Sequence, residues 1–596
     1  MLRMIKNKLH QREGVALAAV MIIMAIAFVL AMSLGFMLLS EITSAKRTSS
    51  VTQAFFAAEG GQEYGRRLLD DAMQTFNVPT ATTYSDISLY ANKAAAGSRA
   101  GDDDIAVLRD FVPNFDMFLP RGETAVSAPL GTGTDATEFD LSYDFTPTGV
   151  DRPAAADPTG AFIFYYDYTI TAVGRKPLAT MGGEQMTKLT GSFEVTIFHP
   201  SFAFYNFFSV NMTTGGGDQI YFAPQETLAG PVYVGSRPGF AGDNHGGGPT
   251  FTDQFMTTWA SYATSDLRYN PAVRWNNEYP PLWNQPAIPT PPNAFSQARI
   301  SMGDYANATD TSTVTNAQRR TALGLTAGTS APPTGVYYAK GSGTNNNGND
   351  TTDLLGGLYI YGNVTSMKLG ANGSHQYIRV AQSTGVTNID IDTAAGTTVV
   401  TPPAGAAKTF NDTPNGLIYV DGTLYDLGGN TSYSSSVQSE IQMTIAADQN
   451  VYIDNHIRYQ TDPIANPDAI NLLGIYSGRG HALIANDAPS NLNVDAILMA
   501  PYAGKGFGVQ DYSTISPKGN LNILGGIIMN SYQAIGTFNS NGGQVSGYRK
   551  NFTYDRRLLN RSFAPPYFPV VQPYAGRLRS ILRTDWAQVV PDFPDE

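Results

Sequence analysis

The segment from Val15 to Leu39, 25 residues without a charged side chain, constrains the fold of this chain more than any other feature. At about 1.5 Å per residue, a helix of this length crosses a bilayer core of roughly 30 Å with some tilt. Four basic residues precede it: Arg3, Lys6, Lys8 and Arg12. Because positive charge flanking a membrane span is retained in the cytoplasm, we expect a single-pass inner-membrane protein whose body, after Ser40, is exported.

The body has the composition of a β-rich exported protein. Charged residues make up only 15%, whereas Gly (59), Pro (36) and Tyr (32) are abundant. A length of 596 residues predicts two or three domains. The absence of cysteine excludes disulfides, thiolate metal sites and cysteine catalysis, and a net charge of -12 argues against nonspecific nucleic-acid binding by the whole surface.

The apolar segment continues without a proline until Pro79. A secretory signal has a shorter apolar core of about 7 to 15 residues, followed by a cleavage site. The continuation carries one apolar helical stripe, interrupted by Gln62 and Gly65, with these members: Val51, Phe55, Ala58, Leu69 and Met73. We therefore predict one helix over 15–78, half in the membrane and half packed on a domain.

The start of this helix resembles that of a type IV pilin. In "QREGVAL", Gly14 stands directly before the apolar run and after a short basic leader, which matches the prepilin-peptidase cleavage pattern. The resemblance implies that the leader 1–14 is removed by a cut between Gly14 and Val15, and that the helix is kept. A plain single-pass anchor or an uncleaved signal is the alternative, and it does not explain Gly14.

The segment is more similar to one branch of that family, the PilX-like minor pilins and the related tip pseudopilins. Their helix carries a downstream "AAE" element, which "QAFFAAEGGQEYGRRL" matches, with Glu59 as its acid. The fifth mature residue, usually a glutamate in major pilins, is Ala19. A buried carboxylate needs a partner, and a subunit at the fibre end has no neighbour to supply one, so Ala19 suits a position at an end of the fibre. The resemblance implies assembly roles for Ala19 and Glu59.

Three later segments alternate apolar and polar residues after a polar, loop-rich stretch from Pro79 to Thr134. They are "EFDLSYDFT", "AFIFYYDYTITAV" and "KLTGSFEVTIF". Period-two patterning predicts an antiparallel meander with one buried face. A long helix on such a sheet is the α+β head of a pilin, which we expect over 79–200.

The stretch 201–535 changes character and predicts a large all-β domain. Short β segments recur between Gly and Asn residues, and from Val451 onward they are spaced by roughly 20 to 30 residues, as in the stacked coils of a β-solenoid. A β-sandwich is the alternative. The arrangement resembles large PilX-like pilins associated with competence, in which a β-solenoid is inserted into the pilin sheet, and this implies that 536–596 returns to the head. The Trp-rich stretch 257–292 is expected to be an insertion on the solenoid flank, and to be the best source of exposed aromatic residues.

Catalytic motifs are absent from the sequence. Six histidines are scattered without ligand spacing, and no GxSxG occurs. The patches "GDDD" (101–104) and "NNNGNDTTD" (345–353) lack the register of a calcium loop and are interpreted as solvated loops. The only carboxylates that could serve a polysaccharide-cleaving solenoid are Asp454, Asp487 and Asp495. We therefore expect no enzyme activity, no cofactor and no metal.

One stretch is strongly basic in this acidic chain. From Tyr548 to Arg583, tyrosines and a single acid, Asp555, are interleaved with eight basic residues: Arg549, Lys550, Arg556, Arg557, Arg561, Arg577, Arg579 and Arg583. Cations contact phosphates and aromatic rings stack on bases, so these residues are candidates for DNA binding. The alternative is that the arginines pair with acids of the body.

Together these features predict a non-enzymatic minor subunit at or near the tip of a type IV pilus. Its expected partners are other pilins, the pilus assembly machinery, prepilin peptidase and the inner membrane, with DNA or a surface receptor as candidate ligands. Before assembly it would be anchored in the inner membrane, and afterwards it would be part of the cell-surface pilus. A tip pseudopilin of a type II secretion system is the first alternative, and a membrane-tethered polysaccharide-degrading enzyme the second.

Overall fold

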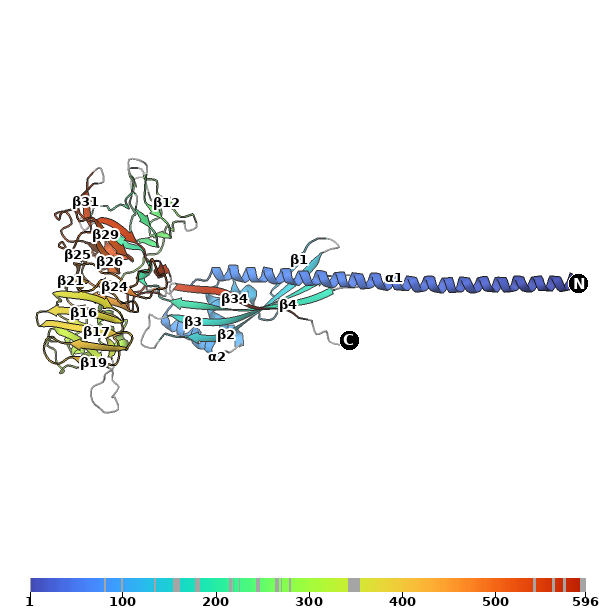
Figure 1. The fold of residues 1–596 in the computed structure, drawn as a ribbon, viewed down its shortest axis with the longest axis horizontal. Helices are drawn as coiled ribbons and strands as arrows, with labels where there is room; N and C mark the ends of the chain where they lie inside the picture. The colour runs from blue at the N-terminus through green and yellow to red at the C-terminus, as the bar shows by residue number, and fades with distance from the viewer. Residues whose placement is uncertain are drawn as a thin grey trace. The chain divides into compact units, whose positions relative to one another are not determined.

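A computed structural model describes residues 2–79, 82–97, 100–132, 136–153, 161–176, 183–213, 217, 219–224, 226–242, 247–262, 267–269, 271–277, 280–340, 354–539, 543–559, 563–571 and 575–589 (Figure 1). The chain forms two compact units. The first comprises Met1–Arg152, Phe162–Ile197 and Gly576–Glu596, and the second comprises Pro153–Ala161 and Phe198–Ala575. Each unit is described by itself.

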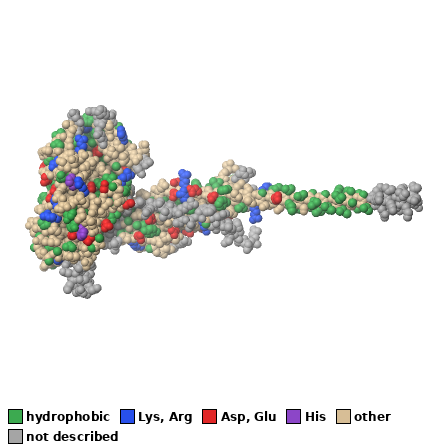
Figure 2. Space-filling view, viewed as in Figure 1, with side chains coloured by type: hydrophobic (Ala, Val, Ile, Leu, Met, Phe, Trp, Pro, Cys, Tyr) green, Lys and Arg blue, Asp and Glu red, His purple; other side chains and the backbone are tan. Residues whose placement is uncertain are grey.

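Helix α1 (Leu2–Gln74) begins the first unit and confirms the long N-terminal helix predicted from the sequence. Its large apolar side chains between Val15 and Leu39 are 47% to 70% exposed. Figure 2 shows hydrophobic side chains along this part of the helix. By length and composition, the segment from Val15 onward is able to cross a membrane, as a single-pass anchor would.

The second half of α1 packs on a sheet through small side chains. Its buried positions are Ser50, Ala54, Ala57, Ala58, Gly61, Gln62, Gly65, Leu69 and Met73. Val51 and Phe55, predicted for the same stripe, are only partly buried. The contact is close, because a Cβ at Gly61 would lie 2.7 Å from the Phe139 ring. The hydroxyl of Tyr143 donates a hydrogen bond to the carbonyl of Gly65 (3.1 Å).

The sheet of the first unit has five strands in the order β1-β2-β3-β4-β34. The strands are β1 (Val126–Leu130), β2 (Thr137–Asp151), β3 (Phe162–Lys176), β4 (Gly183–Phe198) and β34 (Ala575–Val589). The pairs from β1 to β4 are antiparallel, and alternate residues of β3 are buried, which confirms the predicted meander. Strand β34 lies next to β4 in this order, so the chain leaves the sheet and later rejoins it beside the strand from which it left.

Short helices occupy much of the stretch that was expected to be loop-rich. They are α2 (Tyr84–Ala96), η1 (Ala100–Ile105), α3 (Ala106–Phe111) and η2 (Phe115–Phe118). The "GDDD" patch lies in η1, where Asp102 and Asp104 pair with Arg121 (3.0 and 2.6 Å) and Asp103 pairs with Lys93 (3.0 Å). Its carboxylates are therefore held in ion pairs, which differs from the solvated loop expected. The patch 345–353 lies outside the described residues.

The second unit is built mainly from parallel strands. A ten-stranded sheet has the order β10-β7-β5-β30-β27-β24-β22-β20-β14-β13. Its strands are β5 (Phe207–Asn211), β7 (Val232–Val234), β10 (Phe255–Thr257), β13 (Gly335–Lys340), β14 (Leu354–Tyr361), β20 (Leu417–Asp421), β22 (Gln442–Ala447), β24 (Leu472–Ser477), β27 (Ile497–Ala500) and β30 (Ile527–Ser531). Except for β13, which is antiparallel to β14, neighbours in this sheet run parallel.

A second large sheet has nine strands in the order β19-β18-β17-β16-β15-β21-β23-β25-β28. The strands β15 (Ser366–Asn372), β21 (Leu424–Gly429), β23 (Val451–Ile453), β25 (Ala482–Ile484) and β28 (Phe507–Val509) run parallel. The strands β16 (His375–Gln382), β17 (Gly385–Asp392), β18 (Thr397–Thr401) and β19 (Lys408–Phe410) extend it as an antiparallel meander. Several of these strands are labelled in Figure 1.

Smaller sheets and short helices complete the second unit. Strands β26 (Leu492–Asp495), β29 (Asn520–Leu524) and β33 (Arg549–Thr553) are parallel, as are β6 (Thr227–Leu228), β9 (Thr250–Phe251) and β12 (Arg274–Trp275). The remaining elements are β8 (Phe240–Ala241), β11 (Leu267–Arg268), β31 (Gly536–Phe538), β32 (Gln544–Gly547), η4 (Phe202–Phe204), α4 (Phe295–Ser301), η6 (Tyr305–Asn307), α5 (Asn316–Ala322) and η7 (Arg556–Leu559).

Apolar residues are stacked in register through the ten-stranded sheet. The pairings connect one buried row: Leu358, Ile418, Ile445, Ile475, Leu498, Ile527, Phe207, Val232 and Phe255. These residues belong to one hydrophobic core that also contains side chains of the nine-stranded sheet, such as Ile453 and Ile484. Each strand of the ten-stranded sheet therefore buries its apolar side chains against those of the strands on either side.

The first and last parts of the second unit meet inside the ten-stranded sheet, because β5 pairs with both β7 and β30. We call this meeting point the seam. The chain enters the middle of the ten-stranded sheet at β5, winds to one edge at β10, and starts again at the other edge with β13. From there it winds back to β30. Beside the seam, the incoming and outgoing segments are joined by the bridge between Ser201 and Val570.

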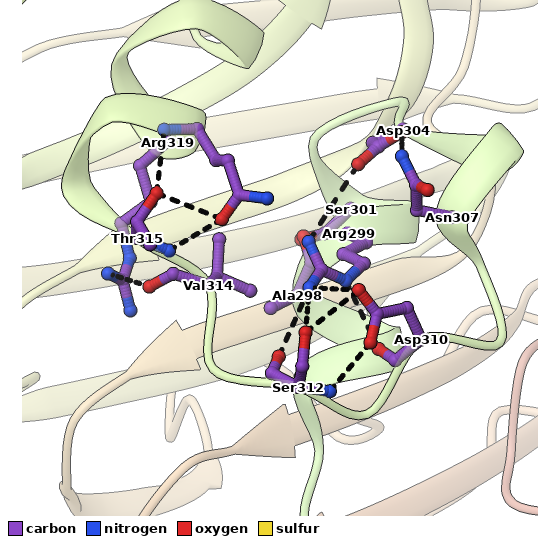
Figure 3. A network of polar contacts seen from close by, with 11 residues as sticks. Ala298, Arg299, Ser301, Asp304, Asn307, Asp310, Ser312, Val314, Thr315 and Arg319 are labelled. Atoms are coloured by element: carbon purple, nitrogen blue, oxygen red, sulfur yellow. Dashed lines mark hydrogen bonds and ion pairs between the residues drawn. The ribbon is translucent and has the colours of Figure 1, made fainter.

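The segment between β12 and β13 covers the outer face of this sheet. The hydroxyl of Tyr476 donates to the carbonyl of Asn293 (2.6 Å), and that of Tyr233 accepts from the backbone of Ile288 (3.0 Å). Figure 3 shows the network that shapes this segment: the buried Arg299 points at Asp310 and at Ser312 (2.6 and 3.1 Å). The buried guanidinium of Arg299 thereby holds this loop closed and donates hydrogen bonds to carbonyls that would otherwise be unpaired.

The Trp-rich stretch 257–292 pairs with other strands of the second unit, which differs from the flank insertion expected. Strand β12 pairs in parallel with β9, and Leu282 bridges to Met256 of β10. Trp275 and Trp283 pack against the core, whereas Trp259 is 43% exposed. Trp275 and Trp283 therefore cover the end of the hydrophobic core at β10.

A ladder of asparagines runs through the strands β26, β29 and β33. Asn522 donates to Asn493 (3.1 Å) and Asn551 donates to Asn522 (2.5 Å). Nδ1 of His456 accepts the backbone N–H of Asn493 (3.1 Å), so the imidazole caps the ladder in its neutral form. Burial, aided by the positive charge of Arg458, lowers the pKa of His456 below its ordinary 6.5.

We expect His456 to make the chain less stable in mild acid. Because its pKa is lower in the folded than in the unfolded state, the unfolded chain binds more protons, and stability is lost as the pH falls below 6.5. In His456→Asn, an amide takes the place of the imidazole without titrating, so part of this acid loss should disappear from thermal melts between pH 5 and 7.5. His375→Asn is the control, since Asp390 raises the pKa of that exposed imidazole. An equal acid loss in wild type and His456→Asn would contradict this role.

Candidate functional sites

The residues expected at the cleavage and assembly positions all lie on helix α1. The helix runs through Gly14 without interruption. Val15 is 70% exposed and Ala19 is also exposed, whereas Glu59 is half-buried beside the buried stripe at Ala58. The proposed roles of these four residues in cleavage and assembly remain predictions.

The four basic residues of the stretch whose side chains the structure describes do not form one surface. Arg561 lies outside the described residues, and so do the side chains of Arg577, Arg579 and Arg583 in β34. Nζ of Lys550 lies 3.1 Å from Glu226 and 4.9 Å from the centre of the Tyr532 ring. Burial acts to lower the pKa of Lys550, but the attraction of Glu226 and Tyr532 outweighs it and raises that pKa. Lys550 therefore joins two distant parts of the second unit.

Arg557 is a buried structural residue. Its side chain is 7% exposed, and its guanidinium bonds to both carboxylate oxygens of Asp555 and to the carbonyls of Ala469 and Asn471 (2.6 and 2.9 Å). A guanidinium held in this way has no surface to offer a phosphate. This corrects the expectation of a DNA contact at Arg557 and favours, for this residue, the alternative of pairing with an acid.

Two cations of the stretch have exposed side chains, Arg549 and Arg556. Arg549 on β33 lies over the ring of Phe538, with 5.7 Å between the guanidinium carbon and the ring centre. Arg556 lines a cleft of about 700 Å³ together with Ile464 and Ile470, whose side chains are 66% and 48% exposed. Among the described basic residues of the stretch, these two can reach a ligand in solution.

The three carboxylates considered for catalysis have different surroundings. Asp487 is exposed, and Asp495 accepts the backbone N–H of Tyr459 (2.9 Å). Burial raises the pKa of Asp495 to about 6. In the described parts of the chain, no hydrogen bond or ion pair joins Asp454, Asp487 and Asp495 to one another.

Asp454 instead belongs to a cluster of three charged side chains on or directly after neighbouring parallel strands. Nζ of Lys368 on β15 lies 2.8 Å from each carboxylate oxygen of Asp454 and also bonds to Asp426 on β21. Asp426 and Asp454 are also close enough to each other to form a hydrogen bond when one of the two carboxyls is protonated. Burial, together with the hydrogen bond that the protonated carboxyl donates to Asp426, raises the pKa of Asp454 to about 7. Burial acts in the same direction on Asp426, but hydrogen bonds from Asp454 and Lys368 hold its pKa below the ordinary value.

Two members of this cluster were missed in the sequence. A signal exists, because "LYDL" and "VYID" each place a tyrosine directly after the first apolar residue of a strand and an aspartate one or two positions later. Tyr425 and Tyr452 stack in parallel with their ring centres 6.0 Å apart. Within the described residues, no group of three or more His, Cys, Asp or Glu is arranged to hold a metal ion.

Comparison of the chain with protein-family models, curated proteins and solved structures finds no match.

Proposed function

We propose that the chain is a membrane-anchored, non-enzymatic subunit of an extracytoplasmic fibre. More specifically, we propose a PilX-like minor pilin, cleaved after Gly14 and carried at or near the tip of a type IV pilus. In this proposal the first unit is the pilin head, and the second unit is a β-solenoid inserted between β4 and β34. The inserted unit is presented outward for assembly and for binding DNA or a surface.

One observation carries this proposal: a single helix combines an exposed apolar half with a half packed on an antiparallel sheet. The exposed half suits a bilayer before assembly and helix packing in a fibre afterwards. The sequence around Gly14 and the "AAE" element at Glu59 add specificity, and Ala19 favours a position at the fibre end. The parallel strands in register support the solenoid interpretation of the second unit.

A tip pseudopilin of a type II secretion system has the same features and is the second candidate. The identity of the fibre that contains this subunit distinguishes the two, and cross-linking in cells followed by identification of the partner subunits would determine it. The polysaccharide-degrading enzyme has less support, because Asp454 is engaged by Lys368 and Asp426.

The proposal predicts a mature protein that begins at Val15. Mass spectrometry of the protein from membranes should find this terminus, and Gly14→Arg should abolish it and leave the leader attached. Gly35→Ala is the matched control, since its added Cβ would have nothing within 4 Å in the structure and should leave processing unchanged. An intact Met1, or a start beyond Leu39, would exclude the pilin interpretation.

A further inference from the structure

We propose that Asp426 and Asp454 hold one proton between them beside the ammonium of Lys368, and that this proton makes the cluster a pH-sensitive staple across three coils. The staple is independent of the proposed pilus function. It connects β15, β21 and β23, which are parallel neighbours in the nine-stranded sheet.

The geometry requires the proton. Side chains on the same face of neighbouring strands lie about 5 Å apart, where like charges destabilise a sheet. Lys368, Asp426 and Asp454 retain only 20%, 31% and 24% of their side-chain exposure, so water screens their charges incompletely. One ammonium balances one carboxylate. The second carboxyl is therefore most stable as the protonated partner in a hydrogen bond between the two.

Within the described residues, Lys368 is the one basic group that forms an ion pair with Asp426 or Asp454. Arg379, the cross-strand partner of Lys368, has an exposed side chain and forms no such pair. Ser366 donates a further hydrogen bond to Asp426. On this face Tyr425 and Tyr452 are the neighbouring titratable groups, and beyond β25 the carboxylate of Asp511 is bonded to Asn486 (2.7 Å).

The direction in which stability changes with pH follows from the raised pKa of Asp454, which is about 7 in the folded chain and 3.8 ordinarily. Between these values the folded chain binds more protons than the unfolded chain, so stability falls as the pH rises and the loss is complete above pH 7. On the alkaline side the two carboxylates repel each other. The contacts among β15, β21 and β23 should then weaken first.

Asp454→Asn tests the staple in the full detergent-solubilised chain. The amide keeps a hydrogen bond to Asp426 but cannot ionise, so the fall in melting temperature of the wild type from pH 6.5 to 8.5 should be absent or clearly reduced. Hydrogen exchange of peptides covering 420–430 and 450–456 should speed up above pH 7, beyond its intrinsic pH dependence, only in the wild type. Asp468→Asn, at an exposed carboxyl in a loop, should keep the wild-type profile.

Lys368→Met provides a second test, because it removes the ammonium and should steepen the alkaline loss. Equal alkaline slopes in the wild type and Asp454→Asn would overturn the proposal. If either variant fails to fold, carbon-13 titration of the assigned carboxyls of Asp426 and Asp454 in the wild type decides the question alone. One of these two carboxyls titrating near pH 7 supports the shared proton, and neither titrating above pH 5 refutes it.

Discussion

Replacing Gly174 by valine is expected to detach helix α1 from the sheet of the first unit. A Cβ at this position of β3 would lie 2.0 Å from the carbonyl oxygen of Ala54 and 2.4 Å from the nitrogen of Ala58. Both atoms belong to the helix backbone, so no side chain can rotate out of the way. Overpacking typically costs about 1–3 kcal/mol, and we expect a loss of about 3 kcal/mol because backbone must move. Thermal melts and limited proteolysis of the helix between Ser50 and Gln74 would measure it.

Gly149→Val is the matched control in the same sheet. Its added Cβ would meet only the ring of Tyr165, at an ordinary distance of 3.6 Å. Valine favours strands, so propensity alone would make both substitutions neutral or stabilising. Equal melting temperatures and equal protease resistance of Gly174→Val and Gly149→Val would show that the close helix–sheet contact does not stabilise this unit.

The sequence was sufficient to predict helix α1 and the meander, but not the face through which they meet. Long unbroken helicity and period-two alternation are local signals, whereas the contact depends on how closely two backbones approach. Val51 and Phe55 were chosen because they are apolar, yet the buried positions include Ser50 and Ala54. Small residues are preferred there because glycines of the partner strand, such as Gly174, face them. That pairing is visible only once the register is known.

The second unit shows the same limit at a larger scale. Apolar segments between Gly and Asn predicted many of its strands, because each strand repeats the same local requirement for buried apolar side chains. The seam at β5 was not predictable, since Phe207 pairs with Ile527 at the far end of the chain's path. The expected return to the head at 536 was also too early. Strand β33 pairs with β29 in the second unit, and only the segment from Gly576 joins the first.

The candidate sites were predicted least well, because adjacency in sequence does not place side chains on one face. Arg549 and Lys550 are neighbours on β33, but alternation turns Arg549 outward and Lys550 toward Glu226. Asp454 was selected as an acid on a predicted coil. Its partners Lys368 and Asp426 come from other strands, and their convergence depends on how those strands pair.

Arg557→Ala is expected to cause the second large effect, a loss of about 3–5 kcal/mol in the stability of the second unit. The substitution leaves the carboxylate of Asp555, whose side chain is 2% exposed, buried without its ion-pair partner. It also removes the donors to the carbonyls of Ala469 and Asn471. Arg556→Ala, one residue away at an exposed position, should change the melting temperature little. Similar melting temperatures for the two variants would contradict a buried structural role of Arg557.

The same two variants separate DNA binding from folding. If the basic stretch contacts DNA, Arg556→Ala should weaken binding and reduce the slope of log affinity against log salt by about 1, because one phosphate contact is lost. Arg557→Ala, measured at a temperature where it remains folded, should leave that slope unchanged, since its guanidinium is bonded to Asp555. A DNA affinity insensitive to salt, or unchanged in Arg556→Ala, would remove this surface as a DNA site. The DNA-binding measurement on Arg556→Ala, and not the one on Arg557→Ala, therefore tests whether the basic stretch has a role beyond stabilising the second unit.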